Sequence, residues 1–394
     1  MTLDVEHAAR LGALDGAASE ARRAELAEHL RAGGVAHEDL RDWLEMVDAL
    51  GELRVVEGVD WQENIGRIAE MLVHTDGAPA VLFDEIPGYP PGYRVLTNAQ
   101  GERPRLAVSL GLRADIGAFE LMDEWERRMD TVPPMPPGLD ELAWVGGVRG
   151  RPVECLRGKY TDLPIPARAE IAMEGFLHPT ERRLEGPFGE WTGYYASASR
   201  DEPVFEVKAL YHRNDPIILG VPPEKPPYEA HRFRQYLRSA NLRRELRLAG
   251  IPDVVGAWCH VVGGCRLFNV VSIKQRYPGH ARQAGHVAAQ CRAGAYLGRI
   301  TVVVDEDIDI TDLSEVMWAV CTRADPESSL DIIHRAWSGP LDPAIEPGKK
   351  GFNSRLVIDA TRPWEWRDRF PPAIGPTPEE KRITRERWSW ILRS

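Results

Sequence analysis

The sequence predicts an α/β protein built as two folded units. A chain of 394 residues is long for a single hydrophobic core, and its 43% apolar content is enough to fill two. Near the N-terminus a helix, a strand, a second helix and a second strand follow one another, and the same alternation returns in the C-terminal third. Helices that alternate with strands are typical of a sheet covered by helices.

The first unit is predicted from three segments. "EDLRDWLEMVDALGELRVV", from Glu38, has acids in its first turn, a stop at Gly51 and then a strand. "WQENIGRIAEML" and "APAVLFDEI" predict the second helix and the second strand. "IGAFELMDEWERRMD" predicts a further helix, which the prolines of "TVPPMPPG" (131–138) end because proline fits neither a helix interior nor a central strand.

The rest of the chain divides into a β-rich middle and a second α/β unit. In the middle we expect strands at "RPVECL", "AEIAMEGF", "YYASAS", "VFEVKALYHR" and "PIILGV", as in a small sheet or barrel. A long basic helix then leads to strands at "DVVGAWCHVV", "CRLFNVVSI", "ITVVVDE" and "LDIIHRA", which alternate with helices over 280–297 and 312–322. The predicted limits are a helical extension over 1–36, an N-terminal domain over 37–224, a linking helix over 225–250 and a C-terminal domain over 251–394, which ends in a helix.

Composition narrows the class of function. A formal charge of −11 and a pI near 5.6 argue against nucleic acid or an anionic membrane as partner, because both need a basic surface. The five cysteines are dispersed and form no CxxC pair, so we expect free thiols in a reducing compartment. No signal peptide or long apolar run is present, which favours a cytoplasmic protein that acts on small molecules.

The segment "EGPFGEWTGYY" (185–195) holds the strongest candidate for chemistry. Regular structure would separate Glu185 from Glu190, but the glycines and Pro187 between them allow a bend that turns both carboxylates toward one cavity. Phe188 and Trp191 would wall that cavity and raise the pKa of the less solvated acid, so that one carboxyl could carry a proton and the other a charge. A surface hairpin with two solvated glutamates accounts for the same pattern.

Further acids precede this segment. Glu170 and Glu174 lie on one face of a predicted strand with His178 close by, which could hold a metal or complete a proton relay. Ion pairs are the alternative, and the nearby arginines are Arg168, Arg182 and Arg183.

Two other patterns are rejected as metal sites. "DEDIDITDLSEV" (305–316) places Asp305, Asp307 and Asp309 as a calcium loop would, but Ile310 occupies the glycine position and Val316 the position of the bidentate glutamate. We interpret it as a strand end followed by a helix N-cap at Asp312 or Ser314. In "CHVVGGC" strand alternation scatters Cys259, His260 and Cys265, so a hairpin core is favoured over a zinc site.

Two features suggest ligand contacts. Lys274 follows a strand, and Gly279 and His280 begin a helix, where an ammonium and free backbone amides could hold a phosphate. The apolar run 217–219 could line a substrate pocket, and an ordinary buried strand explains it equally well. Walker A, GxSxG and clear GxGxxG motifs do not occur.

Several blocks together resemble one family in spacing and order. These are "PIPARAEIAMEGF", "EGPFGEWTGYY", "KQRYPGHARQA", "VVVDEDIDITD" with "MWAVCTRADP", and "VIDAT". They resemble the UbiD family of decarboxylases from about residue 38 to 365, and the "EGPFGE" block is the most specific of them. The resemblance implies a flavin-reductase-like split β-barrel in the N-terminal domain, joined by a long helix to an α/β C-terminal oligomerisation domain.

The resemblance also implies a chemistry. Members of this family use prenylated FMN for the reversible, non-oxidative decarboxylation of aromatic or α,β-unsaturated carboxylic acids, because the cofactor can absorb the electrons that departing CO2 leaves behind. Carried over to this chain, Glu190 is the proton donor and Glu185 its partner carboxylate. "PPGLDELAWVGGVRG" resembles the block whose glutamate binds Mn2+ or Mg2+ at the cofactor phosphate, which assigns that role to Glu141. K+ is a further ion of the expected site.

The chain departs from the family pattern at one place. Family members carry, before the block with Glu141, a segment with an "N-x-G-x-x-R"-like motif and a downstream histidine, whereas "ERRMDTVPPMPPGLDELAW" passes directly across this point near 131–138. Two interpretations follow. The chain is a decarboxylase, supplied with cofactor by a flavin prenyltransferase and assembled as a homodimer or larger homo-oligomer, or it is a noncatalytic relative with a structural role in a carboxylase or decarboxylase assembly.

Overall fold

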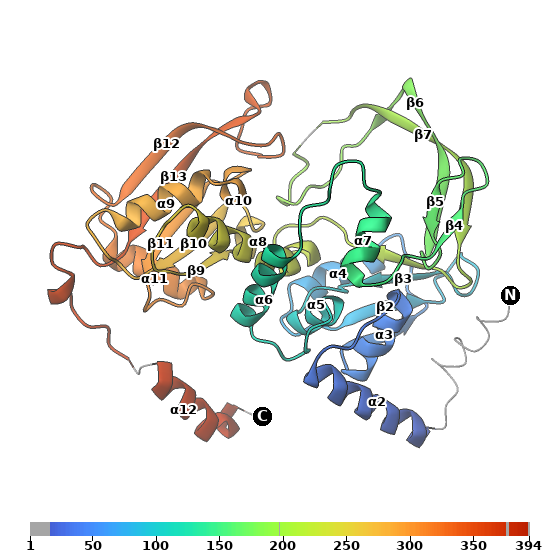
Figure 1. Cartoon of the computed structure of the whole chain (residues 1–394), viewed down its shortest axis with the longest axis horizontal. Helices are drawn as coiled ribbons and strands as arrows, with labels where there is room; N and C mark the ends of the chain where they lie inside the picture. The colour runs from blue at the N-terminus through green and yellow to red at the C-terminus, as the bar shows by residue number, and fades with distance from the viewer. Residues whose placement is uncertain (1–15, 197, 376–377, 393–394) are drawn as a thin grey trace.

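The N-terminal unit is a four-stranded mixed sheet covered by helices. The computed structural model describes residues 16–196, 198–375 and 378–392 (Figure 1). The elements of this unit are α2 (Gly16–Ala32), α3 (Leu40–Ala49), β1 (Leu53–Glu57), α4 (Asn64–Val73), β2 (Ala80–Asp84), β3 (Arg94–Thr97), α5 (Arg103–Ser109) and α6 (Ala118–Thr131). The sheet order is β1-β2-β3-β8, with β1 parallel to β2 and β3 parallel to β8 (Ile217–Gly220).

Local sequence explains the start of this unit. Asp39 caps α3 because its side chain accepts hydrogen bonds from the backbone N–H groups of Arg41 and Asp42. The apolar face of α3, which includes Trp43 and Val47, packs in one core with strand residues of β1, β2 and β3. The predicted α/β class is therefore confirmed here. The predicted helical extension contains α2, and residues 1–15 lie outside the described residues.

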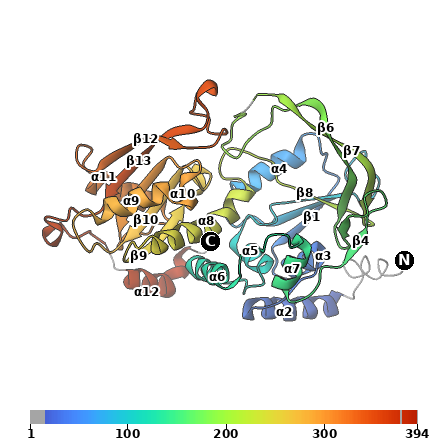
Figure 2. The same cartoon turned by 45° about the horizontal axis from the view of Figure 1, so that its top comes forward.

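The middle of the chain has a different architecture. It contains α7 (Glu141–Arg149), β4 (Cys155–Arg157), β5 (Pro164–Pro166), β6 (Ile171–Glu185) and β7 (Arg200–His212). Within the described part of the chain, β4 pairs only with β5, and β6 only with β7, in antiparallel two-stranded sheets. In Figures 1 and 2 the β6–β7 hairpin forms a curved outer ribbon.

One predicted strand of the middle is wrong. "YYASAS" forms no strand among residues 194–196 and 198–199. The reason is local, because the Glu190 N–H donates to the Tyr194 carbonyl and the Gly193 N–H donates to the Glu190 carbonyl. These bonds close a tight turn, and Gly193 at its end has a φ of 79°, a value that favours glycine.

The middle segment also lacks a buried apolar core. Among the described residues between Asp123 and Pro216, no apolar side chain is buried. Residue alternation places Met173, Gly175 and Leu177 of β6 on one face of the hairpin, opposite Leu210, Val207 and Phe205 of β7. The larger of these apolar side chains are all exposed. One face of the β6–β7 ribbon is therefore apolar and uncovered.

A long helix, α8 (Glu229–Leu248), leads to a second sheet with both faces covered. Its strands are β9 (Val254–Cys259), β10 (Phe268–Ile273), β11 (Ile300–Asp305), β12 (Leu330–Trp337) and β13 (Phe352–Ala360), in the order β12-β13-β11-β10-β9. The central strands β10, β11 and β13 are parallel. Residues of α8 and α9 (His280–Gln290) share a core with Val303, and residues of α6 and α11 (Leu313–Arg323) share another with Val302 and Val304.

The helix predicted over 280–297 is two helices. α9 ends at Gln290, and α10 covers Arg292–Ala295. The break falls at Cys291, whose backbone is extended (φ −64°, ψ 163°) and serves as the N-cap of α10. The helix α12 (Pro378–Trp388) stands apart from the second sheet in Figure 1. No helix among the described residues is long and apolar enough to cross a membrane.

Candidate active site at the junction of the two units

The end of β6 and the loop that follows it carry the two candidate acids, and the loop reaches the junction of the two units. β6 ends at Glu185, and residues 186–199 lead to β7. Glu185 is exposed and its backbone pairs with Arg200, whereas Glu190 is half-buried in the 190–194 turn. Phe188, expected as an apolar wall, is exposed. The two carboxylates thus have different surroundings, and their roles remain a prediction.

Three close approaches fix this loop against the rest of the molecule. A Cβ at Gly189 would lie 3.3 Å from the Pro223 carbonyl, and one at Gly193 would lie 2.7 Å from the Lys225 Cα. A Cβ at Gly264 would run into the Trp191 ring. Gly193 and Gly264 both combine a positive φ with no room for a side chain, so glycine is required there, while a side chain at Gly189 would need a small shift of its neighbour.

Aromatic contacts also hold the loop against α8, and we call this contact region the joint. The Trp191 ring meets the ring of His231, on α8, edge-on at a centroid distance of 6.3 Å, and the Tyr228 and His231 rings are 4.1 Å apart. Tyr228 and His231 are both buried. Burial, followed by the charges of Arg234 and Arg266, lowers the pKa of His231 to about 3, so this ring is neutral at physiological pH.

Three arginines gather beside this joint, and we call Arg234, Arg238 and Arg266 the arginine cluster. The Arg266 guanidinium lies 5.9 Å from the Trp191 ring centroid and 5.2 Å from that of Tyr296. Arg238 donates to the carbonyls of Cys265 and Ala293 at 2.7 and 2.8 Å. Burial, followed by the charges of Arg238 and Arg234, lowers the pKa of Arg266 to about 10.

Tyr228 connects the arginine cluster to Glu190. Burial raises the pKa of the Tyr228 hydroxyl, Arg234 beside it lowers that pKa, and the carboxylate of Glu190 contributes to raising it. Glu190 and Arg234 therefore both act on the Tyr228 hydroxyl. This places an acid and a cation at the same joint between the loop and α8.

The upstream acids are structural. Arg41 donates to both carboxylate oxygens of Glu170 (2.9 and 3.1 Å), and Arg213 also contacts Glu170. The buried carboxylate of Glu174 accepts from the Tyr160 and Thr161 N–H groups and from the Tyr211 hydroxyl. The ion-pair alternative is thus correct for Glu170, although its partners are not the arginines expected. His178 instead contacts Glu206 at 3.1 Å.

The two rejected metal patterns have the structural roles expected of them. Asp305 and Asp307 bind Arg323, and Asp312 caps α11 by accepting from the N–H groups of Ser314 and Glu315. Cys259 and Cys265 lie in the core of the second unit, and His260 is buried between the strands of the β9–β10 hairpin. All five cysteines are free, as expected.

Lys274 lies at the carboxyl ends of the parallel strands, in a pocket of about 210 Å³. Side chains of both charges line this pocket. Besides Lys274, the lining residues are Gln275, Asp305, Glu306, Arg362, Arg367 and Asp368. Asp305 already binds Arg323 and Arg362 there. A phosphate role for Lys274 remains a prediction. In the run 217–219, only Ile217 is buried, and Ile218 and Leu219 are exposed.

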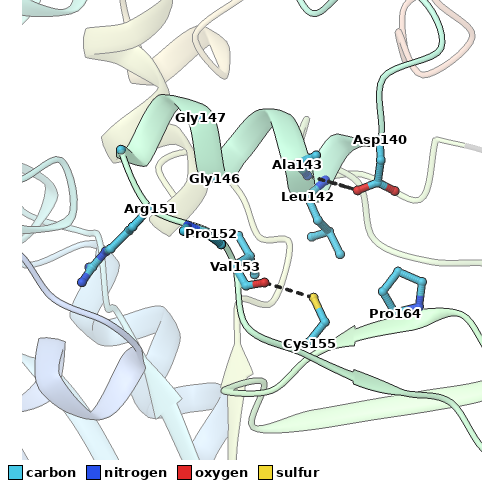
Figure 3. Close-up of a pocket in the computed structure, with 11 residues that line it drawn as sticks. Asp140, Leu142, Ala143, Gly146, Gly147, Arg151, Pro152, Val153, Cys155 and Pro164 are labelled. Atoms are coloured by element: carbon cyan, nitrogen blue, oxygen red, sulfur yellow. Dashed lines mark hydrogen bonds between the residues drawn. The ribbon is translucent and has the colours of Figure 1, made fainter.

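Glu141 begins α7 beside a larger pocket of about 680 Å³ (Figure 3). The pocket lies between α7 and the segment 150–155, and Gly146 allows the close approach because a Cβ there would lie 3.1 Å from the Arg151 carbonyl. Its only carboxylate is Asp140, which caps α7 through Leu142 and Ala143. Within the described ranges no three His, Cys, Asp or Glu side chains gather as metal ligands, so the metal role of Glu141 remains a prediction.

The arginine cluster and the docking of Trp191 are what sequence reasoning missed. Arg234 and Arg238 are four residues apart and so lie on one face of α8, which was a readable signal. Arg266 could not be assigned to the same place, because nothing local in the sequence brings the β9–β10 turn to that helix face.

Comparison with known proteins settles the family. The N-terminal, Rift-related and C-terminal domain models of 3-octaprenyl-4-hydroxybenzoate carboxy-lyase match residues 44–125, 129–226 and 231–360, in that order. The chain belongs to the UbiD family. The junction described above is therefore the place where the Rift-related and C-terminal domains of this UbiD chain meet.

Curated relatives are longer than the part they share with this chain. An uncharacterized protein of Aquifex aeolicus is 36% identical over 262 residues, 65% of this chain and 52% of that protein. The phenolic acid decarboxylase of Bacillus subtilis is 34% identical over 223 residues, 57% of this chain and 46% of that protein. The chain thus spans about half the length of the curated relatives it matches.

Solved structures share the fold. The vanillic acid decarboxylase of Sedimentibacter hydroxybenzoicus in its open form has a TM-score of 0.76 and 23% identity, over 91% of this chain and 100% of that one. The UbiD-class enzyme HmfF of Pelotomaculum thermopropionicum, in complex with FMN, has a TM-score of 0.71 and 23% identity, over 89% of this chain and 100% of that one. The predicted α/β class and the family resemblance are both confirmed.

Proposed function

We propose that this UbiD chain is a carboxy-lyase that releases CO2 from an aromatic or α,β-unsaturated carboxylic acid with prenylated FMN as cofactor. The observation that carries the proposal is the position of the "EGPFGEW" loop. In a chain that matches the family from 44 to 360, this loop places the candidate proton donor Glu190 at the joint of the two units. The reaction is reversible in principle, and a flavin prenyltransferase would supply the cofactor.

The residues present suit a flavin in chemical character. The β6–β7 ribbon offers an uncovered apolar face of the kind a flat ring covers, and the arginine cluster offers cations for an anionic chain. When bound, the prenylated flavin would hold the electron pair that CO2 leaves on the substrate carbon. A divalent metal fits less well, since no three-ligand group occurs in the described part of the chain, and no step here depends on one.

Glu190 and Glu185 would carry out two successive proton transfers. After the carbon–carbon bond to the carboxylate breaks, a new carbon–hydrogen bond needs one proton, which Glu190 would donate from its half-buried position. Exposed Glu185 would return a proton to Glu190 from water and so reset the site. Trp191, held by Gly264 and His231, would keep Glu190 in place and exclude water on one side.

The experiment is co-expression with a flavin prenyltransferase, followed by an absorption spectrum and a CO2-release assay on a panel of aromatic and enoic acids. We expect bound flavin, CO2 release, and a loss of about 10²-fold or more in kcat for Glu190→Gln with flavin retained. Glu181→Gln is the matched control, because Glu181 is an exposed glutamate of the same hairpin. Colourless protein, or unchanged turnover in Glu190→Gln, would refute the proposal.

A second candidate is a noncatalytic subunit of a carboxylase or decarboxylase assembly. The observation that favours it is the lack of any buried apolar side chain among the described residues between 123 and 216, because an apolar ribbon left in water is typical of a surface that another chain covers. Under this interpretation the purified chain would remain colourless and inactive, and it would form a stable complex with a flavin-loaded UbiD protein in size-exclusion chromatography. Independent flavin binding with turnover would exclude it.

A further inference from the structure

A short stretch just before α8, residues 223–225, runs along the loop that carries Glu190, and we call it the clamp segment. A Cβ at Gly189 would lie 3.3 Å from a carbonyl oxygen of this segment, and one at Gly193 would lie 2.7 Å from one of its Cα atoms. These two contacts are on either side of Glu190 in the chain. Glu224 is the central residue of the clamp segment and therefore lies between them.

Glu224 is a half-buried acid that the proposed reaction does not use. Its Oε2 is shielded from solvent and has no hydrogen-bond partner among the described residues. In the same part of the chain no ion pair joins Glu224 to a cation. A carboxylate in such a place is costly when it is charged, because nothing replaces the water that it loses.

The charges that act on Glu224 come from α4. The carboxylate of Glu70 opposes its ionisation, and His74 favours it. These two residues also form an ion pair, with 3.5 Å between the Glu70 Oε1 and the His74 Nδ1. The end of α4 is fixed to α8, because Arg232 donates to the carbonyl of the last α4 residue at 2.7 Å. The other charges nearby are exposed Lys225 and the carboxylate of the candidate proton donor on the loop.

We propose that Glu224 is a positioning residue, which keeps the Glu190 loop docked while it carries a proton and weakens the docking when it is ionised. A protonated Glu224 brings no charge into its half-buried position. An ionised Glu224 leaves an unpartnered oxygen there and is repelled by Glu70. Movement of the clamp segment toward water relieves both effects, and the loop loses its contacts at Gly189 and Gly193 when the segment moves.

The pKa of Glu224 fixes the direction of the pH dependence. Burial, followed by the charge of Glu70, raises this pKa to about 7 in the docked state, and in water it returns toward its ordinary value of 4.5. Docking is therefore strongest below pH 4.5, weakens as the pH rises from there to about 7, and changes little above that. The inference rests on the proposed function only in naming Glu190 as the proton donor.

Hydrogen–deuterium exchange of the peptide 186–196 tests the proposal on the full chain, without flavin or substrate. Wild type and variants are compared at the same pH, because the intrinsic exchange rate also depends on pH. At pH 8 the wild-type peptide should exchange about five- to tenfold faster than that of Glu224→Gln, and at pH 5 the two should exchange alike. Amides of the buried strand β10 should exchange equally in both proteins, which identifies a local opening.

Glu70 offers an independent variant. Its side chain is 58% exposed, so Glu70→Lys should fold, and a cation in place of the opposing carboxylate should restore most of the protection of the peptide at pH 8. This effect should shrink as salt rises. Glu63→Lys is the matched control, because it makes the same change at an exposed residue at the other end of α4 and should exchange like wild type.

The outcomes separate this inference from the proposed function. A loop that exchanges more slowly in Glu224→Gln and Glu70→Lys at pH 8 supports the inference even in a chain that releases no CO2. Equal exchange of wild type and Glu224→Gln at pH 8, or no effect of Glu70→Lys, overturns it even if the chain proves to be a decarboxylase.

Discussion

The C-terminal sheet and the β6–β7 ribbon both contain many apolar residues, but these side chains are buried in the sheet and exposed in the ribbon. Val270, Val271, Val302, Val303 and Val304 in β10 and β11 are completely buried, whereas Met173, Leu177 and Leu210 of the ribbon are 62%, 64% and 59% exposed. The central parallel strands have helices on both faces, whereas the apolar side chains of the two-stranded ribbon remain exposed. Burial therefore depends on whether the chain supplies the covering layer.

The difference has a counterpart in the sequence. Helices of this chain cover both faces of the C-terminal sheet, and α6 of the N-terminal unit is one of them. The prolines at 131–138, by contrast, stand where the family resemblance leads one to expect a longer segment before α7. We infer that the C-terminal unit carries most of the folding free energy. The middle segment is held mainly by the Arg41–Glu170 ion pair, by its continuation into β8 and by the docked Trp191 loop.

The largest expected difference in unfolding free energy is between the same substitution at two valines, one in the sheet and one in the ribbon. Val303→Asp places an unpaired charge in a fully buried strand and should cost about 4 kcal/mol or more of unfolding free energy, enough to prevent folding. Val207→Asp makes the same change on the exposed apolar face of the ribbon and should change the free energy by about 0.5 kcal/mol or less. Urea denaturation checks both, and equal costs at the two sites would contradict the comparison.

Removing an ion pair should cost somewhat less stability, and the cost should again differ between the two regions. Arg323 is buried and donates to buried Asp305 and to half-exposed Asp307 at 2.8 to 3.0 Å. Arg323→Met leaves Arg362 as the remaining cation at Asp305 and should cost about 3 kcal/mol. Arg183 pairs with Glu181 on the exposed ribbon, and Arg183→Met should cost about 0.5 kcal/mol or less. A large loss of stability for Arg183→Met in thermal denaturation would show that the ribbon is more tightly built than its exposure indicates.

The outcome of the sequence predictions follows the same division. In the C-terminal unit the alternation of strands and helices, the Asp312 cap and the core role of Cys259 and Cys265 were all predictable, because local patterns and packing agree there. In the middle segment "YYASAS" was mistaken for a strand, because apolar and small residues alternate in it while a turn at 190–194 governs its backbone.

The candidate site was predictable in part for a related reason. The Glu185–Glu190 block could be identified as a motif, but its docking could not, because it depends on Gly264 lying beside Trp191 from a distant part of the chain. The pairing of Glu170 with Arg41 and Arg213 was out of reach in the same way, since Arg41 is 129 residues away. Contacts between distant segments decide which acids are free for chemistry and which are structural.

A smaller loss of stability is expected where the Trp191 loop meets the C-terminal unit, and comparing alanine substitutions at two glycines measures it. Both Gly264 (φ 59°) and Gly250 (φ 80°) adopt a conformation that disfavours other residues, so alanine should cost about 1 kcal/mol at either site. Gly264→Ala should cost about 1–3 kcal/mol more, because its Cβ meets the Trp191 ring, while Gly250 has open space around it. Chemical denaturation measures the difference, and equal costs would mean that Trp191 is not docked there.

The smallest expected effect is a pH dependence at the same joint. Burial, followed by the charge of Glu70, raises the pKa of Glu224 to about 7, and its Oε2 has no hydrogen-bond partner among the described residues. An acid whose pKa is higher in the folded than in the unfolded state favours folding below its unfolded pKa, and this advantage is lost as pH rises through about 7. The unfolding free energy should therefore fall by about 1 kcal/mol between pH 5 and pH 8 through this group. Glu224→Gln should remove that part of the slope, and Glu57→Gln, at an exposed position of β1, should leave it unchanged. If the wild type and Glu224→Gln keep parallel stability curves, Glu224 is hydrated and the joint is open to water.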